Sequence, residues 1–309
     1  MAQPRRILIV GGTGMIGGYA ALHLHSHGYA VTLAGRHPVK EVPILKDLPF
    51  IKINYVSGEY TPDVFSSFDS IVFSAGADVR HVPQNSFADE YYLQSSEAIV
   101  EFARSARDAG VARFVHIGSF YPHIAPQLVD TVPYIRSRKL AADGITSLAT
   151  TQFHACSLDA PFVVGVVPGM KVPMFVAYTQ FAEGKLGIPP SAPTGNTNFV
   201  SVESLAIAIT AALEQSESVS SRAILIGGEN LTFSEYFGLF FSAVGNHIAI
   251  PASNQEHPLM PDSSLWAGRS IEAYEPDASD EALLGNYRRE SIRDTVQRIV
   301  KEYRSLQLV

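Results

Sequence analysis

A glycine-rich turn near the amino terminus constrains this chain more than any other feature of its sequence. Apolar residues 7–10 predict a buried strand, the run Gly11-Gly12-Thr13-Gly14-Met15-Ile16-Gly17 follows at once, and a helical pattern extends to about His27. Glycines at this spacing let the backbone approach a pyrophosphate over a helix N-terminus. We therefore predict a dinucleotide site formed by Gly11, Thr13, Gly14, Met15, Ile16 and Gly17.

Strand and helix patterns alternate through the first half of the chain. Helical patterns lie between several strand-like runs, and the most regular of them is Asp89–Ala109. Such alternation predicts an α/β fold with a doubly wound parallel sheet of the Rossmann type. The predicted strands are residues 7–10, 30–34, 51–56, 70–74, 113–118 and 152–158.

The pattern changes after about Pro161, where proline and glycine become frequent. We predict a dinucleotide-binding core over residues 1–160 and a smaller substrate-binding lobe mainly over 161–309, with 197–227 returning to the core sheet. Thr232 and Glu235 have the spacing of a capping box at the start of a helix. Helices are predicted over Ser201–Glu214, from Thr232 to Val244 and over Arg289–Tyr303, and a strand over Ala223–Ile226. The polar, proline-containing stretch Pro251–Asp280 has no pattern that assigns its elements.

Composition limits the partners. The formal net charge is -7, with 23 Lys plus Arg against 30 Asp plus Glu, which argues against nucleic acid. Cys156 is the single cysteine, so we expect no intramolecular disulfide and a buried thiol in a strand. We find no apolar run long enough for a membrane span, no signal sequence and no metal site, since His23, His25 and His27 do not share one helix face. The expected setting is the cytoplasm and the expected partner a small molecule.

The end of the second predicted strand indicates which dinucleotide is bound. A site for NAD usually presents an acid here to the ribose hydroxyls, whereas this chain has Gly35-Arg36-His37. The Arg36 guanidinium can bind a 2′-phosphate, which a carboxylate would repel, with His37 and Lys40 as helpers. NADP (NADPH) is therefore the predicted cofactor.

With these motifs placed, the chain resembles the extended and atypical short-chain dehydrogenase/reductases, which include NAD-dependent epimerases and dehydratases and dihydroflavonol-type reductases. The resemblance covers nearly the whole chain, although Ser204 stands where an Asp is usual in the lobe motif that begins at Asn198. It implies that Glu59, after Gly58, lies near adenine, and that Pro161 and Phe162 line the nicotinamide. It further implies that the adenosine ribose is contacted by Ser74, Ala75 and Gly76.

The resemblance implies a catalytic Tyr with a Lys four residues later and a Ser that orients the carbonyl oxygen. Ser119 and Tyr134 fit, but Arg138 occupies the fourth position and Lys139 follows it. At about 100° per residue, Arg138 lies roughly 40° from Tyr134 on a helix and Lys139 roughly 140° away. A helix that starts after Tyr134 would instead let Lys139 reach inward, so both cations remain candidates.

Other departures from the family pattern bear on the site. Tyr121 is a rival proton donor, and Tyr92 stands about where the family often has a structural Asn. Asp159 replaces a basic or amide residue before the Pro, which argues against a sugar-diphosphate substrate. The resemblance also implies a homodimer formed through the helices Asp89–Ala109 and Thr131–Leu148.

Three functions fit these residues. The first is an NADPH-dependent reductase of a small apolar or aromatic carbonyl compound, with Tyr134 as proton donor. The second is a nucleotide-sugar epimerase or dehydratase, which should carry several cations in the lobe to bind the pyrophosphate. Between Pro161 and Ser221, however, the only Lys or Arg residues are Lys171 and Lys185. The third is a non-catalytic sensor or regulator that binds NADP(H), favoured by the displaced Lys139.

Overall fold

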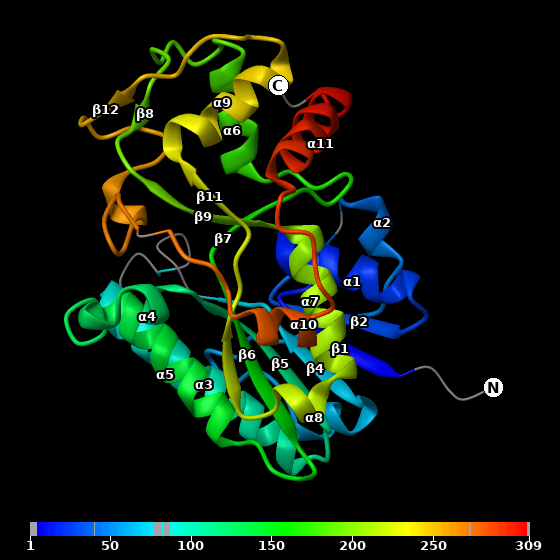
Figure 1. Cartoon of the computed structure of the whole chain (residues 1–309). Helices are drawn as coiled ribbons and strands as arrows, with labels where there is room; N and C mark the ends of the chain where they lie inside the picture. The colour runs from blue at the N-terminus through cyan, green and yellow to red at the C-terminus, as the bar shows by residue number, and fades with distance from the viewer. Residues whose placement is uncertain (1–4, 40, 77–81, 83–86, 272, 308–309) are drawn as a thin grey trace.

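A seven-stranded parallel sheet forms the centre of the molecule in a computed structural model, which describes residues 5–39, 41–76, 82, 87–271 and 273–307 (Figure 1). The strand order β10-β6-β5-β4-β1-β2-β3 reverses direction between β1 and β4. This is the doubly wound order in which ligands bind outside the carboxyl ends of the strands, at the switch point. The strands are β1 (Arg6–Val10), β2 (Ala30–Gly35), β3 (Phe50–Lys52), β4 (Ser70–Phe73), β5 (Arg113–Ser119), β6 (His154–Ala160) and β10 (Arg222–Leu225).

Helices cover both faces of this sheet. On one face, α1 (Met15–Ser26) and α7 (Val202–Glu214) enclose an aliphatic core that includes Ile7 and Leu158. On the other, α3 (Ala88–Asp108) and α5 (Pro133–Ser147) pack against each other over a second core. Central strands apolar on both faces require such coverage, which explains their near-continuous apolar runs. The predicted doubly wound α/β fold is confirmed.

The third strand is shorter than its sequence predicts. It ends at Lys52 rather than Val56, because the chain turns back and Asn54 bridges Glu59 in antiparallel fashion. Gly58 makes this turn possible with φ of +70°, a left-handed conformation that favours glycine. Short elements connect the strands elsewhere: α2 (Pro43–Lys46), η1 (Pro62–Ser67), α4 (Tyr121–Ile124), η2 (Pro126–Leu128) and α8 (Ser216–Val219).

A smaller lobe stands at the carboxyl side of the sheet (top of Figure 1). Its core is aromatic and joins three helices to a mixed three-stranded sheet of order β11-β9-β7. The capping box at Thr232 and Glu235 is present at the start of α9, as predicted. The elements of the lobe are β7 (Phe162–Val164), α6 (Pro173–Ala182), β8 (Ala192–Pro193), β9 (Asn196–Ser201), β11 (Glu229–Thr232), α9 (Phe233–Val244), β12 (Ala252–Ser253), η3 (Asp262–Ser264) and α11 (Ile292–Ser305). The helix α10 (Ala278–Leu283) instead lies beside the large sheet, where Asp280 pairs with Arg222 of β10.

Residues 197–227 cross between the two parts of the molecule. Within this range β10 pairs with β6 at the edge of the large sheet, and α7 packs on α1. The strand β9, in contrast, pairs with β7 and β11 outside the large sheet. The return to the core sheet therefore involves β10 and not β9, while the division into domains at residue 160 stays a prediction.

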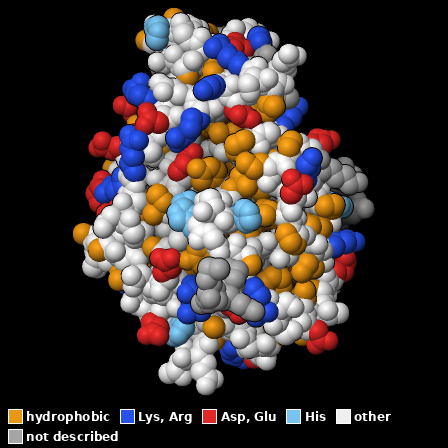
Figure 2. Space-filling view, turned by 90° about the vertical axis from the view of Figure 1, so that its right-hand side faces the viewer, with side chains coloured by type: hydrophobic (Ala, Val, Ile, Leu, Met, Phe, Trp, Pro, Cys, Tyr) orange, Lys and Arg blue, Asp and Glu red, His pale blue; other side chains and the backbone are white. Residues whose placement is uncertain are grey.

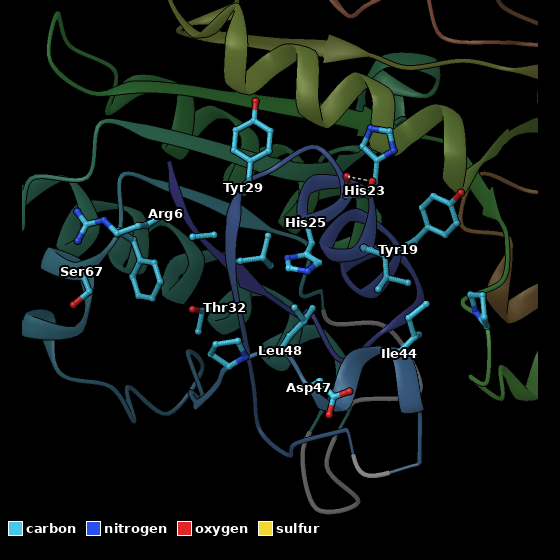
Figure 3. Close-up of a pocket in the computed structure, with 17 residues that line it drawn as sticks. Arg6, Tyr19, His23, His25, Tyr29, Thr32, Ile44, Asp47, Leu48 and Ser67 are labelled. Atoms are coloured by element: carbon cyan, nitrogen blue, oxygen red, sulfur yellow. Dashed lines mark hydrogen bonds between the residues drawn. The ribbon is translucent and has the colours of Figure 1, made fainter. Parts of the chain in front are cut away.

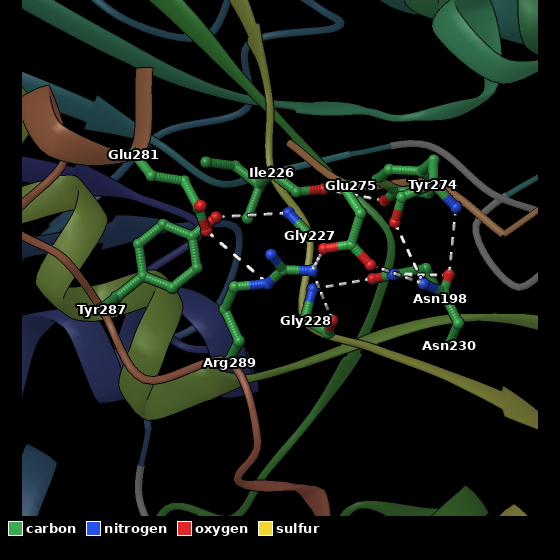
Figure 4. Close-up of polar contacts among 10 residues, drawn as sticks. All are labelled: Asn198, Ile226, Gly227, Gly228, Asn230, Tyr274, Glu275, Glu281, Tyr287 and Arg289. Atoms are coloured by element: carbon green, nitrogen blue, oxygen red, sulfur yellow. Dashed lines mark hydrogen bonds and ion pairs between the residues drawn. The ribbon is translucent and has the colours of Figure 1, made fainter. Parts of the chain in front are cut away.

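A polar network fixes the last third of the chain against the crossing between β10 and β11 (Figure 4). The Arg289 guanidinium pairs with Glu275 and Glu281. Gly228 N donates to Asn198 Oδ1 at 2.8 Å, and Gly227 N donates to the Tyr287 hydroxyl. The terminal helix begins at Ile292, three residues later than predicted, and Arg289 lies in the segment before it.

Two further predictions concern single features. Cys156 is buried in β6, as predicted. Within the described residues, no helix combines the length and the apolar character needed to cross a membrane.

Candidate active site

The glycine loop packs closely against the end of β4. Gly11 has φ of +83°, and a Cβ there would lie 2.6 Å from the backbone nitrogen of Ala75. A Cβ on Gly17 would lie 2.4 Å from the carbonyl oxygen of Gly11. Gly14, in contrast, is exposed, and its nearest neighbour would be 3.4 Å away. Two glycines therefore close the turn, and the third leaves its outer side open.

The N-terminus of α1 opens at this loop. Among the described residues no side chain caps the helix, whose N-cap is Gly14. Amide groups at such an end have a favourable field for an anion. Met15 and Ile16 are half-buried with their side chains against the core, so only their backbone faces the loop, and Thr13 lies beside Gly35. The arrangement fits a pyrophosphate.

The predicted adenine end lies beyond β2 and β3. Arg36 directly follows β2, and Glu59 lies in the turn after β3. Both side chains are exposed, and Ser57 Oγ donates to Glu59 Oε1 at 2.8 Å. Because β2 and β3 are parallel neighbours, the two residues stand at the same edge of the sheet. Lys40 lies outside the described residues.

The end of β4 meets the helix that carries the predicted proton donor. Ser74 Oγ donates to the carbonyl oxygen of Val10 at 2.9 Å, so this hydroxyl joins β4 to β1. Gly76 lies against Arg138, since a Cβ on this glycine would be 3.0 Å from Nη2 of the arginine. The segment after β4 and the helix α5 are therefore in contact at Gly76. A side chain at this position would occupy the space that the Arg138 guanidinium fills.

Tyr134 and Arg138 contact each other on one face of α5. The helix begins at Pro133, so Tyr134 already lies inside it, with only 9% of its surface exposed. Arg138 Nη2 donates to the phenol oxygen at 3.2 Å, and the guanidinium carbon lies 4.9 Å from the ring centroid. The residue four positions after the tyrosine is therefore its neighbour, as the helix geometry predicts.

Lys139 points away from this contact. Its Nζ pairs with Asp143 Oδ2 at 2.7 Å, and both side chains are about half exposed. The alternative in which the helix starts after Tyr134 and turns Lys139 inward does not match the structure, because Pro133 already begins the helix. The catalytic roles of Tyr134, Arg138 and Lys139 stay predictions.

Ser119 and Tyr121 stand at the end of β5. Ser119 is 8% exposed, and its Oγ accepts from the Tyr121 backbone nitrogen at 3.5 Å. Burial, followed by the neighbouring Tyr134, raises the pKa of the Tyr121 phenol. A raised pKa holds the proton more firmly, so Tyr121 is the weaker candidate for the proton donor.

Pro161 and Phe162 connect the two sheets. Pro161 is buried, and Phe162 begins β7 half-buried. The Phe162 ring lies edge-on to Phe120 at 6.1 Å and 5.9 Å from Phe199. Both residues follow β6 directly and stand at its carboxyl end, where the nicotinamide was predicted.

A buried polar chain beside the site was not predicted from the sequence. His123 Nε2 and Asp159 Oδ2 are 2.7 Å apart, Ser157 Oγ donates to Asp159 Oδ1 at 2.5 Å, and His116 Nδ1 lies 2.9 Å from Ser157 Oγ. Burial, and to a lesser extent Arg138, lowers the pKa of His116 to about 3. The only sequence signal for this chain of contacts was an acid and a histidine within otherwise apolar strand sequences. The pairing of β5 with β6 brings these residues together.

A large cavity lies elsewhere. A volume of about 1040 Å³ opens at the amino ends of the strands, beside α1 and α2, with Tyr19, His25 and Ile44 among its lining residues (Figure 3). Hydrophobic side chains gather between charged ones on this side of the molecule (Figure 2). None of the predicted site residues lines this cavity. We place the candidate site at the carboxyl ends instead, because the glycine loop follows β1 and Ser119 ends β5 at this edge of the sheet.

Solved structures of similar fold cover the whole chain. The enzyme WbmG of Bordetella bronchiseptica, solved in complex with NAD, is 17% identical with a TM-score of 0.73, over 100% of this chain and 96% of that chain. The UDP-N-acetylglucosamine 4-epimerase from Bacillus cereus is 15% identical with a TM-score of 0.72, over 97% and 96%. The protein gox2253 is 15% identical with a TM-score of 0.74, over 98% and 99%. At these identities the likeness shows a shared fold.

Sequence comparison identifies the family. No curated protein matches the chain. A family model described as "NAD dependent epimerase/dehydratase family" matches residues 7–227, which include the glycine loop, Ser119 and Tyr134. The predicted resemblance is confirmed, and the chain belongs to the NAD-dependent epimerase/dehydratase family of extended short-chain dehydrogenase/reductases.

Proposed function

We propose that this protein is an NAD(P)-dependent oxidoreductase that acts on a carbon bearing oxygen, with Tyr134 as its acid and base. The contact between Arg138 Nη2 and the Tyr134 phenol oxygen, at 3.2 Å, carries this proposal. It puts a permanent cation on a phenol beside the carboxyl ends of the sheet, where the fold binds its ligands. A bound dinucleotide would supply or accept the hydride.

Each residue has a separate task in this proposal. The Ser119 hydroxyl holds the substrate oxygen, and Tyr134 gives that oxygen a proton or takes one from it. Arg138 stabilises the phenolate by its charge but keeps its own protons, because guanidinium stays protonated in proteins. Gly11 and Gly17 keep the loop closed so that the open side at Gly14 and the helix amides receive the pyrophosphate.

We further propose NADP as the preferred cofactor. Arg36 is exposed directly after β2, with Glu59 on the adjacent strand end. A guanidinium there favours the 2′-phosphate, whereas the structural neighbours named above include an enzyme solved with NAD.

Arg36→Ala is therefore expected to weaken NADPH binding about 10- to 100-fold and leave NADH binding within about threefold. Fluorescence titration of both nucleotides measures this. Lys52→Ala, an exposed cation on β3, is the control. Equal effects of Arg36→Ala on the two nucleotides would contradict the NADP assignment.

Our first candidate substrate is a small apolar or aromatic carbonyl compound. Aromatic rings surround Tyr134: Trp266 stacks on it at 4.4 Å, and Tyr92 and Tyr121 lie edge-on. Two cations of the lobe are paired with acids, Arg269 with Asp262 and Lys185 with Glu183. Aromatic surroundings of Tyr134, together with cations that are already paired with acids, favour a substrate without a diphosphate.

The second candidate is a nucleotide sugar. The description of the family supports it, as do the epimerases and dehydratases among the structural neighbours. Epimerisation or dehydration would use the same Tyr134 and Ser119, with a cofactor that returns to its starting state. The comparisons favour this candidate over the reductase, while the surroundings of Tyr134 favour the reductase.

A substrate screen separates the candidates. Purified protein is incubated with NADPH and a panel of aromatic and aliphatic carbonyl compounds, and separately with UDP-sugars and NAD or NADP. Nucleotide consumption at 340 nm indicates a reductase, and a changed sugar without net nucleotide consumption indicates an epimerase or dehydratase. Tyr134→Phe should lower either activity about 100- to 10,000-fold and leave a measurable residual rate. Tight NADPH binding without turnover of any compound would instead favour the non-catalytic sensor.

A further inference from the structure

The ring of Tyr134 is held from several sides by other side chains. Trp266 stacks in parallel, with ring centroids 4.4 Å apart and planes at 12°. Arg138 lies against the same ring at its hydroxyl end. Tyr92 meets it edge-on at 5.4 Å and Tyr121 at 6.2 Å. The phenol therefore has little freedom to turn.

Trp266 comes from a segment that is itself fixed. It lies between η3 and α10, next to the buried Leu265. The backbone nitrogen of Ile271 donates to Asn196 Oδ1 at 3.1 Å, and the Tyr274 hydroxyl donates to the carbonyl oxygen of Ile226 at 2.8 Å. These bonds fasten the segment to β9 and to the end of β10, so the indole is held where it meets the ring.

The burial of Trp266 also differs from that of a core residue. The indole is half-buried, whereas Tyr92 beside it is 1% exposed. Part of the indole therefore remains exposed to solvent, while one face of it packs on the Tyr134 ring. The indole of Trp266, which packs in parallel on Tyr134 and stays partly exposed, is therefore suited to holding the Tyr134 ring in one orientation.

We propose that Trp266 is a positioning residue for Tyr134 and sets the direction of its hydroxyl in the site. The proposal rests on the proposed function, because it assigns Trp266 a task in the same proton transfer. Arg138 holds the phenol oxygen through one hydrogen bond, and the parallel indole limits movement of the ring out of its plane, so the hydroxyl keeps its position. Proton transfer depends steeply on such alignment.

A double-mutant cycle tests this task. Trp266→Ala should lower kcat about 10- to 100-fold for the best substrate of the screen, with NADPH binding unchanged, and Trp266→Phe should restore most of it. In a Tyr134→Phe background, Trp266→Ala should cause no further loss, because the hydroxyl it guides is absent. An equal loss in both backgrounds would show that Trp266 is only structural and would overturn the proposal.

A second measurement needs no substrate. Trp266 is the single tryptophan of the chain, so tryptophan emission reports on the surroundings of this residue alone. Tyr134→Ala should shift the emission to longer wavelength and at least double its quenching by acrylamide, and Tyr134→Phe should preserve both, with circular dichroism confirming the fold. Unchanged emission in Tyr134→Ala would overturn the stacking. Stacking without turnover of any compound would instead refute the proposed function and, with it, the catalytic task of Trp266.

Discussion

At the scale of single residues, the site departs from its family in a way that helix geometry explains. A residue four positions after Tyr134 must share its face, and Arg138 does so, while Lys139 points to solvent and pairs with Asp143. The sequence predicts this once both residues are assigned to one helix. The sequence does not decide where that helix starts, because Pro133 suits the first turn of a helix as well as an irregular segment before it.

The two cations should therefore differ strongly under mutation. Arg138→Ala is expected to lower kcat about 100-fold, because the phenolate loses its neighbouring charge. Lys139→Ala should change kcat less than twofold and stability by less than about 1 kcal/mol, because an exposed ion pair contributes little. Steady-state kinetics and urea unfolding measure both. A larger loss in Lys139→Ala than in Arg138→Ala would contradict this assignment.

His116 should make the fold sensitive to acid. Burial holds its pKa at about 3, below the usual 6.5, so the folded protein keeps the ring neutral while the unfolded chain binds a proton. The stability due to the neutral ring is complete above pH 6.5 and is lost as the pH falls from 6.5 towards 3. His116→Gln, which cannot titrate, removes this contribution.

Unfolding by urea at pH 6.5 and pH 4.5 measures the difference. The free energy of unfolding should fall by about 2 kcal/mol more in the wild type than in His116→Gln over this interval. Titratable groups that both proteins share are controlled for in this comparison. Equal pH dependence of the two proteins would show that the fold does not lower the pKa of His116.

At the scale of elements, the pairing of β5 with β6 depends on a glycine. Gly118 faces Asp159 in the register, and a Cβ there would lie 1.9 Å from Asp159 Oδ1 and 2.5 Å from Ser157 Oγ. The missing side chain provides the space in which the buried carboxylate reaches His123. A polar chain between two strands thus needs an empty position on one of them.

Replacement of this glycine should be costly. Gly118→Ala is expected to destabilise the protein by about 1–3 kcal/mol, because the carboxylate must leave its partners. Gly238→Ala in α9 is the matched control, since a Cβ there meets nothing within 4 Å among the described residues and alanine favours a helix. It should stabilise by about 0.5–1 kcal/mol. Chemical denaturation measures both, and equal changes would refute the steric argument.

At the scale of the whole molecule, the sheet and the glycine loop follow from local patterns, but the site does not. Apolar runs and glycine spacing indicate β1, α1 and the doubly wound order. The contact of Trp266 with Tyr134 joins residues far apart in sequence, and the segment between Pro251 and Asp280 has no periodicity that would place it. Tertiary hydrogen bonds fix it instead, which a sequence pattern does not record.

One arginine should be decisive for the position of that segment. Arg289 pairs with Glu275 and Glu281 in the network of Figure 4, so Arg289→Ala is expected to lower stability by about 1–2 kcal/mol, a few degrees in Tm, and to increase acrylamide quenching of Trp266. Arg288→Ala, which removes an exposed pair with Asp294, should leave both within error. Similar effects in the two variants would disprove the role of the network.

The crossing of residues 197–227 has a consequence for how such proteins diversify. The residues that we propose to hold the dinucleotide and to donate the proton lie before residue 163. The indole that stacks on Tyr134 comes from Trp266, in the later part of the chain that returns to the lobe after β10. Changes in the carboxyl-terminal third that keep Trp266 can therefore alter which molecule is accepted without touching the hydride and proton chemistry. A library restricted to residues 262–276, with Trp266 kept, would search substrate preference while the inherited reaction stays constant.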